Sequence, residues 1–170
     1  RERLDETRCA LAMMENLDFN VGRVLKRLEE LGLEQNTIVI YFSDNGPNTA
    51  RWNGGLKGIK SSVDEGGVRS VFFIRWLAGG IRAGTVIRPV TGAIDLLPTL
   101  TALAGIPRVG EKPLDGRDLS PLLLRKNSAW NDRMIFSSQD SRAAVRSQRY
   151  LYKGDGTLFD LVDDPGQTKD

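Results

Sequence analysis

Residues 37–69 read TIVIYFSDNGPNTARWNGGLKGIKSSVDEGGVR, and this stretch decides which kind of fold the chain can form. Its first part, Thr37–Phe42, is a short apolar run rich in β-branched and aromatic side chains, which predicts a buried strand. A polar sequence, Ser43–Pro47, follows the strand directly, and a glycine-rich loop comes after it. Ligands of α/β proteins collect beyond the carboxyl ends of the strands, so we expect the functional site here.

Two kinds of side chain in this stretch indicate chemistry. Asp44 and Asn45 offer a carboxylate and an amide oxygen, which are the ligands that calcium or magnesium prefers. Lys57 and Lys60 return in the glycine-rich loop and suit an anion. The sequence Asp-Asn-Gly-Pro is also typical of a plain turn, and the residues alone leave these two interpretations open.

A phosphate loop of a nucleotide-binding protein is a weaker interpretation of residues 54–61. Ile59 falls where that motif requires a glycine before the lysine. The adjacent pair Gly66 and Gly67 also predicts a loop in place of the helix that follows a phosphate loop, because glycine is a poor helix former.

Composition excludes several classes of protein. The 170 residues suffice for one domain with a core. The formal net charge is +2, from 24 basic and 22 acidic residues, so no strong field attracts nucleic acid or an anionic membrane. No apolar run approaches the roughly 20 residues of a membrane span. The sequence has no histidine and one cysteine, Cys9, which we expect to be a small buried helix residue that cannot form an internal disulfide.

Three stretches show the three- and four-residue spacing of apolar residues that is typical of helices. They are residues 3–32, 93–104 and 119–124. Gly32 is expected to cap the end of the first helix. Pro98 should kink the second helix or set a short first turn, and Asp118 is a candidate N-cap of the third.

Other short runs are typical of strands, separated by turn residues. They are Val71–Trp76, Thr85–Val90, Met134–Ser138, Ala143–Ser147, Arg149–Lys153 and Thr157–Leu161. Val71–Trp76 is expected to be a second buried strand and Thr85–Val90 a short extended segment. The last four runs predict a small antiparallel sheet, with a hairpin loop at Gly154–Gly156.

The motifs, taken in order, resemble the second half of the formylglycine-dependent sulfatase family. Its members carry a strand ending in Asp-Asn-Gly, then a glycine-rich loop with lysine, then Glu-Gly-Gly-Val/Ile-Arg. Asp44–Gly46, Gly54–Lys60 and Glu65–Arg69 match these motifs in the same order. Asp95–Leu100 continues the match. So do Leu158–Leu161 and Asp164–Gly166 at the end, and the resemblance therefore covers nearly the whole chain.

The resemblance implies an α/β, alkaline-phosphatase-like fold, present in part. Residues 1–130 would then be the C-terminal part of the catalytic domain, and residues 131–170 a small antiparallel subdomain. The sulfatase signature residues Glu65, Gly66 and Gly67 are expected to form loop structure. Their glycines would permit a positive φ or a close backbone approach, and Arg69 would pair with an unidentified carboxylate.

The resemblance also implies roles for the site residues. Asp44 and Asn45 would be ligands of a calcium or magnesium ion. Lys60 would be the catalytic lysine that contacts the sulfate, and it is preferred over Lys57, which is kept as a second substrate-binding residue. The implied substrate is a sulfated small molecule or glycan. Trp52 lies in the same loop and either packs, as Trp76 and Trp130 are expected to do, or borders the substrate.

The family's nucleophile motif has no counterpart in this sequence. The residues around Cys9 do not form Cys-x-Pro-Ser-Arg, and the formylglycine, its arginine, the histidines and the first metal carboxylates are missing. We therefore interpret the chain as a carboxyl-terminal fragment or processed product, inactive alone, whose expected partner is the N-terminal half of the same enzyme. It should expose apolar surface or an unpaired strand edge. Two alternatives stay open: a related phosphoesterase or phosphonate hydrolase, and an inactive sulfatase-like binding module.

Overall fold

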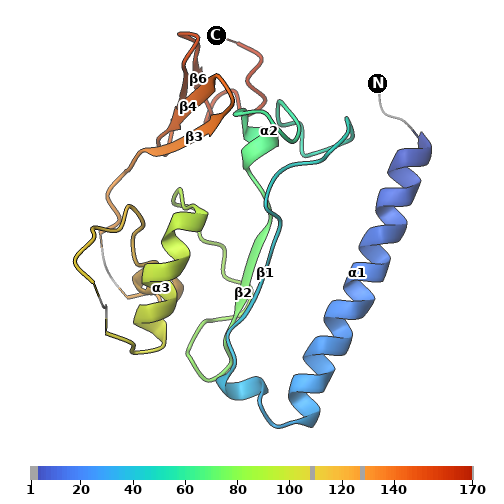
Figure 1. Cartoon of the computed structure of the whole chain (residues 1–170), viewed down its shortest axis with the longest axis vertical. Helices are drawn as coiled ribbons and strands as arrows, with labels where there is room; N and C mark the ends of the chain where they lie inside the picture. Colours follow the sequence, from blue (N-terminus) through green and yellow to red (C-terminus); the bar gives the residue numbers. More distant parts are fainter. Residues whose placement is uncertain (1–3, 108–109, 127–128, 170) are drawn as a thin grey trace.

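The long N-terminal helix, α1 (Leu4–Glu30), runs along one side of the chain (Figure 1). The structure is a computed structural model that describes residues 4–107, 110–126 and 129–169. Gly32 ends the helix in the left-handed conformation, with φ +65°, as the sequence predicts. None of the helices in these ranges is long and apolar enough to cross a membrane.

No residue of α1 is buried, because the helix stands apart from the strands beside it (Figure 1). The expectation that Cys9 is buried is wrong, since its side chain is exposed. Apolar side chains of the helix are also exposed to solvent: the exposed fraction is 62% for Leu11 and 65% for Phe19. Within the described residues the stripe that predicts the helix is therefore at most half-buried.

A short 3₁₀ turn, η1 (Glu34–Asn36), leads from α1 into the first strand, β1 (Val39–Phe42). It pairs in antiparallel fashion with β2 (Phe72–Arg75), and the two form a two-stranded sheet. Both strands lie within the predicted ranges, but the prediction that they are buried is wrong. Most of β1 is half-buried and Phe73 of β2 is 63% exposed, because within the described residues each strand pairs with only one other strand.

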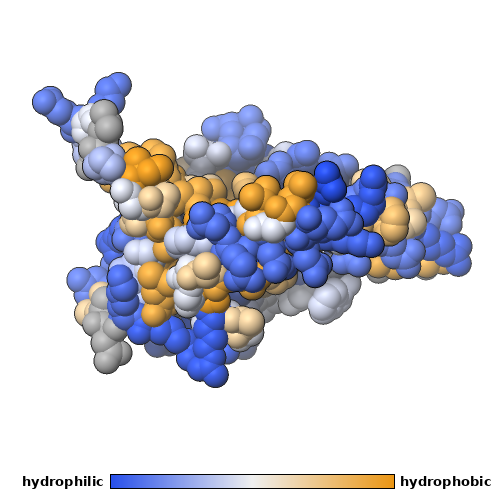
Figure 2. Space-filling view, turned by 90° about the horizontal axis from the view of Figure 1, so that it is seen from below, coloured by the Kyte–Doolittle hydropathy of each residue, from blue (hydrophilic) through white to orange (hydrophobic). Residues whose placement is uncertain are grey.

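Apolar surface is therefore exposed, as expected for part of a larger fold. It includes Val71 and Phe72 at the start of β2, which are 51% and 42% exposed. Figure 2 shows apolar residues reaching the surface in several patches, between hydrophilic side chains.

The helix expected at residues 93–104 begins with a 3₁₀ turn, η2 (Ala93–Asp95), and continues as α3 (Leu96–Leu103). Pro98 lies in the first turn of α3, where its missing N–H costs no helical hydrogen bond, so a short first turn is the outcome. Residues 85–90, for which a short extended segment was expected, are assigned to no helix or strand.

Asp95 and Thr99, one helical turn apart, are buried and hold the loop that leads to the next helix. One carboxylate oxygen of Asp95 accepts hydrogen bonds from Arg117 N (2.7 Å) and from the guanidinium of Arg133 (2.6 Å). The other accepts from Gly92 N (2.9 Å), and the Thr99 hydroxyl accepts from Leu119 N (2.8 Å). The Asp-Leu-Leu-Pro-Thr motif therefore has a structural role in this chain.

The helical turn α4 (Ser120–Leu123) follows this loop. The Asp118 carboxylate accepts hydrogen bonds from Ser120 N (2.7 Å) and from the Ser120 hydroxyl (2.8 Å). Asp118 thus stabilises the beginning of α4, but the prediction that it is the N-cap residue is wrong, because Leu119 occupies that position.

The last four strands form the predicted antiparallel sheet, in the order β3-β4-β5-β6. They are β3 (Ile135–Gln139), β4 (Arg142–Arg146), β5 (Tyr150–Lys153) and β6 (Leu158–Asp160). A hydrogen bond from Gly156 N to Lys153 O (3.0 Å) closes the predicted hairpin between β5 and β6. The buried cluster under this sheet contains Ala144, Leu151, Phe159 and Leu161, together with Val63. Val63 belongs to the glycine-rich loop, so the C-terminal sheet packs directly on the segment of the candidate site.

Candidate functional site

The turn after β1 carries the two candidate metal ligands. It is shaped by hydrogen bonds from Ser43 N to Val71 O (3.3 Å) and from the Ser43 hydroxyl to Asn45 O (3.0 Å). Asp44 is exposed and Asn45 is half-buried. Within the described ranges neither side chain has a hydrogen-bond or ion-pair partner, so their oxygens are available to a cation.

These two residues make only part of a metal site. The described part of the chain holds no group of three or more acidic, histidine or cysteine side chains placed to bind a metal ion. Calcium takes six to eight oxygen ligands. A carboxylate and an amide fit such an ion chemically, and they would supply only part of its ligands.

The Glu-Gly-Gly-Val signature forms one turn of α-helix, α2 (Glu65–Val68), in contrast to the predicted loop. Close packing explains why glycines stand here: a Cβ on Gly66 would lie 2.5 Å from the carbonyl oxygens of Lys57 and Gly58. Gly66 N donates to Lys57 O (2.6 Å). Neither Gly66 nor Gly67 has a positive φ, so close backbone approach is the reason for this pair.

The same helical turn also holds residues 43–46, which contain the two candidate metal ligands and are called the metal-ligand turn below. Gly46 N donates to Gly67 O (2.9 Å), and a Cβ on Gly46 would overlap the carbonyl oxygen of Gly66. Gly46 follows Asp44 and Asn45 directly, so any displacement of α2 is transmitted to the two candidate ligands.

The two lysines lie in different surroundings. Lys60 N donates to Pro47 O (2.9 Å), which places Lys60 beside the metal-ligand turn, and its exposed ammonium has no partner within the described residues. The Lys57 ammonium lies 4.9 Å from the centre of the Phe159 ring and 3.5 Å from Gln167 O. Lys57 is thus engaged by the C-terminal subdomain, which favours Lys60 as the lysine that contacts a substrate.

Two carboxylates of the loop are paired with cations from the C-terminal sheet. Arg146 Nε of β4 donates to Glu65 Oε1 (3.0 Å), and Lys153 Nζ of β5 lies 3.2 Å from Asp64 Oδ1. Arg69 approaches the other oxygen of Glu65 (3.7 Å), which identifies the carboxylate that the sequence left unnamed. Local sequence patterns could not reveal Arg146, because 81 residues separate it from Glu65.

Trp52 differs from the other two tryptophans. Trp76 and Trp130 are half-buried, whereas Trp52 is 84% exposed, so the interpretation of Trp52 as a packing residue is wrong. The loop that carries it is ordered by Asn53, whose side-chain amide donates to Leu56 O (2.9 Å) and Gly58 O (3.2 Å). Trp52 is free to contact a substrate.

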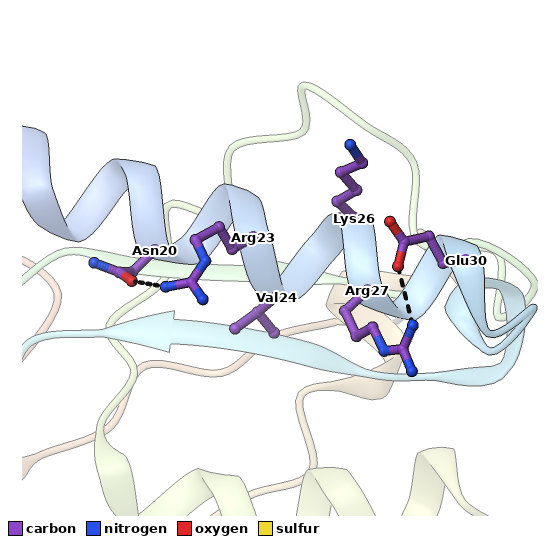
Figure 3. A pocket seen from close by; sticks show the side chains of 6 residues that line it. All are labelled: Asn20, Arg23, Val24, Lys26, Arg27 and Glu30. Carbon is purple, nitrogen blue, oxygen red and sulfur yellow. Dashed lines mark hydrogen bonds and ion pairs between the residues drawn. The ribbon is translucent and has the colours of Figure 1, made fainter.

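A hollow on the surface of α1 is no second candidate site. The residues that line it are all on α1: Asn20, Arg23, Val24, Lys26, Arg27 and Glu30 (Figure 3). Arg23 already bonds Asn20 (3.0 Å), Arg27 already bonds Glu30 (3.1 Å), and Lys26 points away from the others. No set of polar groups converges there.

Comparison with known proteins gives matches to sulfatases. The family model described as Sulfatase matches residues 2–106. Arylsulfatase A of Homo sapiens is 42% identical over 125 residues, which cover 71% of this chain and 24% of that protein. Steryl-sulfatase of Mus musculus is 40% identical over 120 residues, covering 65% of this chain and 19% of that protein. The chain thus spans about a fifth to a quarter of the length of these relatives.

Solved structures agree in fold. A Bacteroides thetaiotaomicron sulfatase from a locus for glycosaminoglycan metabolism superposes with a TM-score of 0.73 at 24% identity, over 91% of this chain and 38% of that chain. A 2-O GAG sulfatase gives a TM-score of 0.70 at 25% identity, over 91% and 35%. The fold predicted from the sequence, part of an α/β, alkaline-phosphatase-like domain with a small C-terminal sheet, is confirmed.

Proposed function

Because the chain belongs to the sulfatase family, we propose that the protein carrying it hydrolyses sulfate esters. The named relatives are sulfatases, so neither a phosphoesterase or phosphonate hydrolase nor an inactive binding module is favoured. The substrate class is a sulfated small molecule or glycan. The nucleophile, a formylglycine in this family, would be supplied by an N-terminal half outside this chain, and the chain alone would not turn over substrate.

One observation supports the proposal: the hydrogen bond from Lys60 N to Pro47 O brings the backbone of Lys60 beside the Asp44–Asn45 turn, and the Lys60 ammonium has no partner among the described residues. The sulfuryl oxygens carry negative charge, which is redistributed as the ester is cleaved. A positive group held beside those oxygens lowers the barrier by electrostatic stabilisation.

Asp44 and Asn45 would hold the calcium or magnesium ion, which, when bound, supplies a Lewis acid for the sulfuryl oxygens. Lys60 would contact the sulfate directly as the catalytic lysine. Lys57 is the weaker candidate for substrate contact, because its ammonium already lies over Phe159. Its main role would be to support the loop that presents Lys60.

The test measures hydrolysis of an aryl sulfate by the protein that carries this chain. Lys60→Ala should lower kcat/KM by roughly 10²- to 10³-fold, the usual effect of removing one group that stabilises transition-state charge. Lys26→Ala, on the exposed surface of α1, is the matched control and should leave kcat/KM unchanged. Lys57→Ala should have a smaller effect than Lys60→Ala.

Two results would contradict the proposal. One is full activity in Lys60→Ala, because the assigned sulfate contact would then be absent. The other is turnover by the purified 170-residue chain without any companion polypeptide, because its nucleophile would then lie within this sequence.

A further inference from the structure

The C-terminal tail reaches back to the candidate site through Gln167, which is only 2% exposed. Its side-chain oxygen accepts a hydrogen bond from Glu65 N (2.8 Å), and its amide nitrogen donates to Asp64 Oδ1 (3.2 Å). The N–H groups at the start of a helix have no partner within the helix. Asp64, at the N-cap position of α2, makes no capping bond with its own side chain. Gln167 therefore satisfies the first N–H of α2 from 102 residues away.

Hydrogen bonds of the preceding turn hold Gln167 in this position. Its φ is +54°, in the left-handed region that residues with a Cβ rarely adopt. The preceding turn imposes this conformation: Gln167 N donates to Asp164 O (3.1 Å), and the Asp164 carboxylate accepts from the Thr168 hydroxyl (2.9 Å) and from Lys169 N (2.8 Å). An unfavourable backbone conformation at a buried polar residue indicates that its side-chain contacts matter.

Two cationic side chains of the C-terminal sheet also bind residues at the start of α2. Lys153 lies 3.2 Å from the carboxylate of Asp64, the group that also accepts from Gln167, and Arg146 donates to Glu65. Asp64 and Glu65 are only 13% and 4% exposed at their side chains. The start of α2 is therefore fixed from the C-terminal side by one amide and two cations.

α2 in turn forms hydrogen bonds with both parts of the candidate site. Gly67 O accepts from Gly46 N, next to the Asp44–Asn45 turn, and Gly66 N donates to Lys57 O, at the start of the loop that ends in Lys60. The backbone oxygen of Gln167 lies 3.5 Å from the Lys57 ammonium as well.

We infer that Gln167 is a positioning residue: its carboxamide fixes α2. Through α2 it sets the spacing between the metal-ligand turn and the loop that carries Lys57 and Lys60. The consequence for catalysis rests on the proposed function, whereas the mechanical link does not. The C-terminal subdomain would thereby control how the site is assembled, without contacting the substrate.

The test uses the protein that carries this chain, with Gln167→Met, which keeps the length of the side chain and removes both hydrogen-bonding groups. Gln148→Met is the matched control: the Gln148 amide also joins two distant segments, accepting from Val90 N (2.8 Å) and donating to Arg88 O (3.2 Å), and neither partner belongs to α2. Hydrogen exchange by mass spectrometry, calcium binding by calorimetry and aryl sulfate kinetics are measured on each.

Gln167→Met should speed exchange in peptides covering residues 44–47 and 57–69, while peptides from β3 to β5 stay protected. Calcium binding and kcat/KM should each weaken by roughly ten- to a hundredfold, the usual effect of losing a residue that orients metal ligands. Gln148→Met should change none of the three.

Unchanged exchange across residues 44–69 in Gln167→Met would overturn the inference, whatever the kinetics show. A lower melting temperature with wild-type calcium affinity and kcat/KM would also overturn it, because Gln167 would then serve packing alone. If the wild-type protein neither bound calcium nor cleaved the sulfate ester, the proposed function would fail. The exchange experiment would still decide whether Gln167 holds α2.

Discussion

Replacing Asp95 with alanine should destabilise the region around α3 more than any surface change in the chain. Asp95 is fully buried, and its carboxylate accepts three hydrogen bonds, from Gly92 N, Arg117 N and the Arg133 guanidinium. The guanidinium is itself buried, with 4% of the side chain exposed. Asp95→Ala therefore leaves a buried cation and two backbone N–H groups without their acceptor.

The magnitude follows from the loss of one partner of a buried ion pair, which costs about 3–5 kcal/mol because the remaining charge is uncompensated. A natural domain is stable by only about 5–15 kcal/mol. The substitution should thus remove a large share of the stability and lower the urea midpoint by one to several molar, given a slope of about 1–3 kcal/mol per molar.

The assay is urea unfolding of the purified chain, followed by tryptophan fluorescence, with Trp130 as a local reporter because Arg117 lies over its ring (5.9 Å). The double variant Asp95→Ala/Arg133→Met should be less destabilised than the sum of the two single variants, because it removes the unpaired charge. Asp5→Ala, which deletes an exposed ion pair with Arg8, is the control and should stay within about 0.5 kcal/mol of wild type.

The reasoning is refuted if Asp95→Ala changes the free energy of unfolding by less than about 1 kcal/mol, the cost of a typical single hydrogen bond. Strict additivity in the double variant would refute it too, since Asp95 and Arg133 would then not act as a pair.

Gly46→Ala should lower the melting temperature, because the new Cβ overlaps the Gly66 carbonyl and forces α2 away at a cost of about 1–3 kcal/mol. Gly22→Ala on α1, with open space around its Cβ, should instead stabilise the helix, so equal melting of the two variants would contradict the packing argument. The hydrogen bond from Lys169 N, with those from Thr168, lowers the pKa of Asp164 below its ordinary value of 3.8, although burial opposes the shift. The stabilisation of the tail turn by this carboxylate is complete above the unfolded pKa and is lost as the pH falls through the lower folded pKa. An NMR titration of the Asp164 carboxyl carbon with a midpoint at or above 3.8 would count against this assignment.

Local periodicity predicts much of the fold. The apolar stripe of residues 3–32 predicts α1, and the four short runs after Asn127 predict the β3–β6 sheet, because side-chain spacing of 3.6 or 2 residues is a property of the chain itself. The ordered motifs around Asp44 and Glu65 indicate the sulfatase family, which the family model confirms. The roles of Asp44, Asn45 and Lys60 stay predictions.

Which strands are buried, and which distant residues contact one another, was decided only by the tertiary structure. The sequence predicts that the strands β1 and β2 are buried, yet their residues are half-buried or exposed, because burial depends on neighbouring elements and not on the apolar character of the strand. Gly66 and Gly67 form a helical turn against their propensity, because its first N–H bonds Gln167 and its glycines admit close backbone packing. Lys57 and Lys60 lie in the same glycine-rich loop, and only the tertiary structure distinguishes them. The Lys57 ammonium lies over Phe159, whereas Lys60 lies beside Pro47 and its ammonium has no partner among the described residues. Such contacts join residues up to 110 positions apart, and no local pattern encodes which of them will meet.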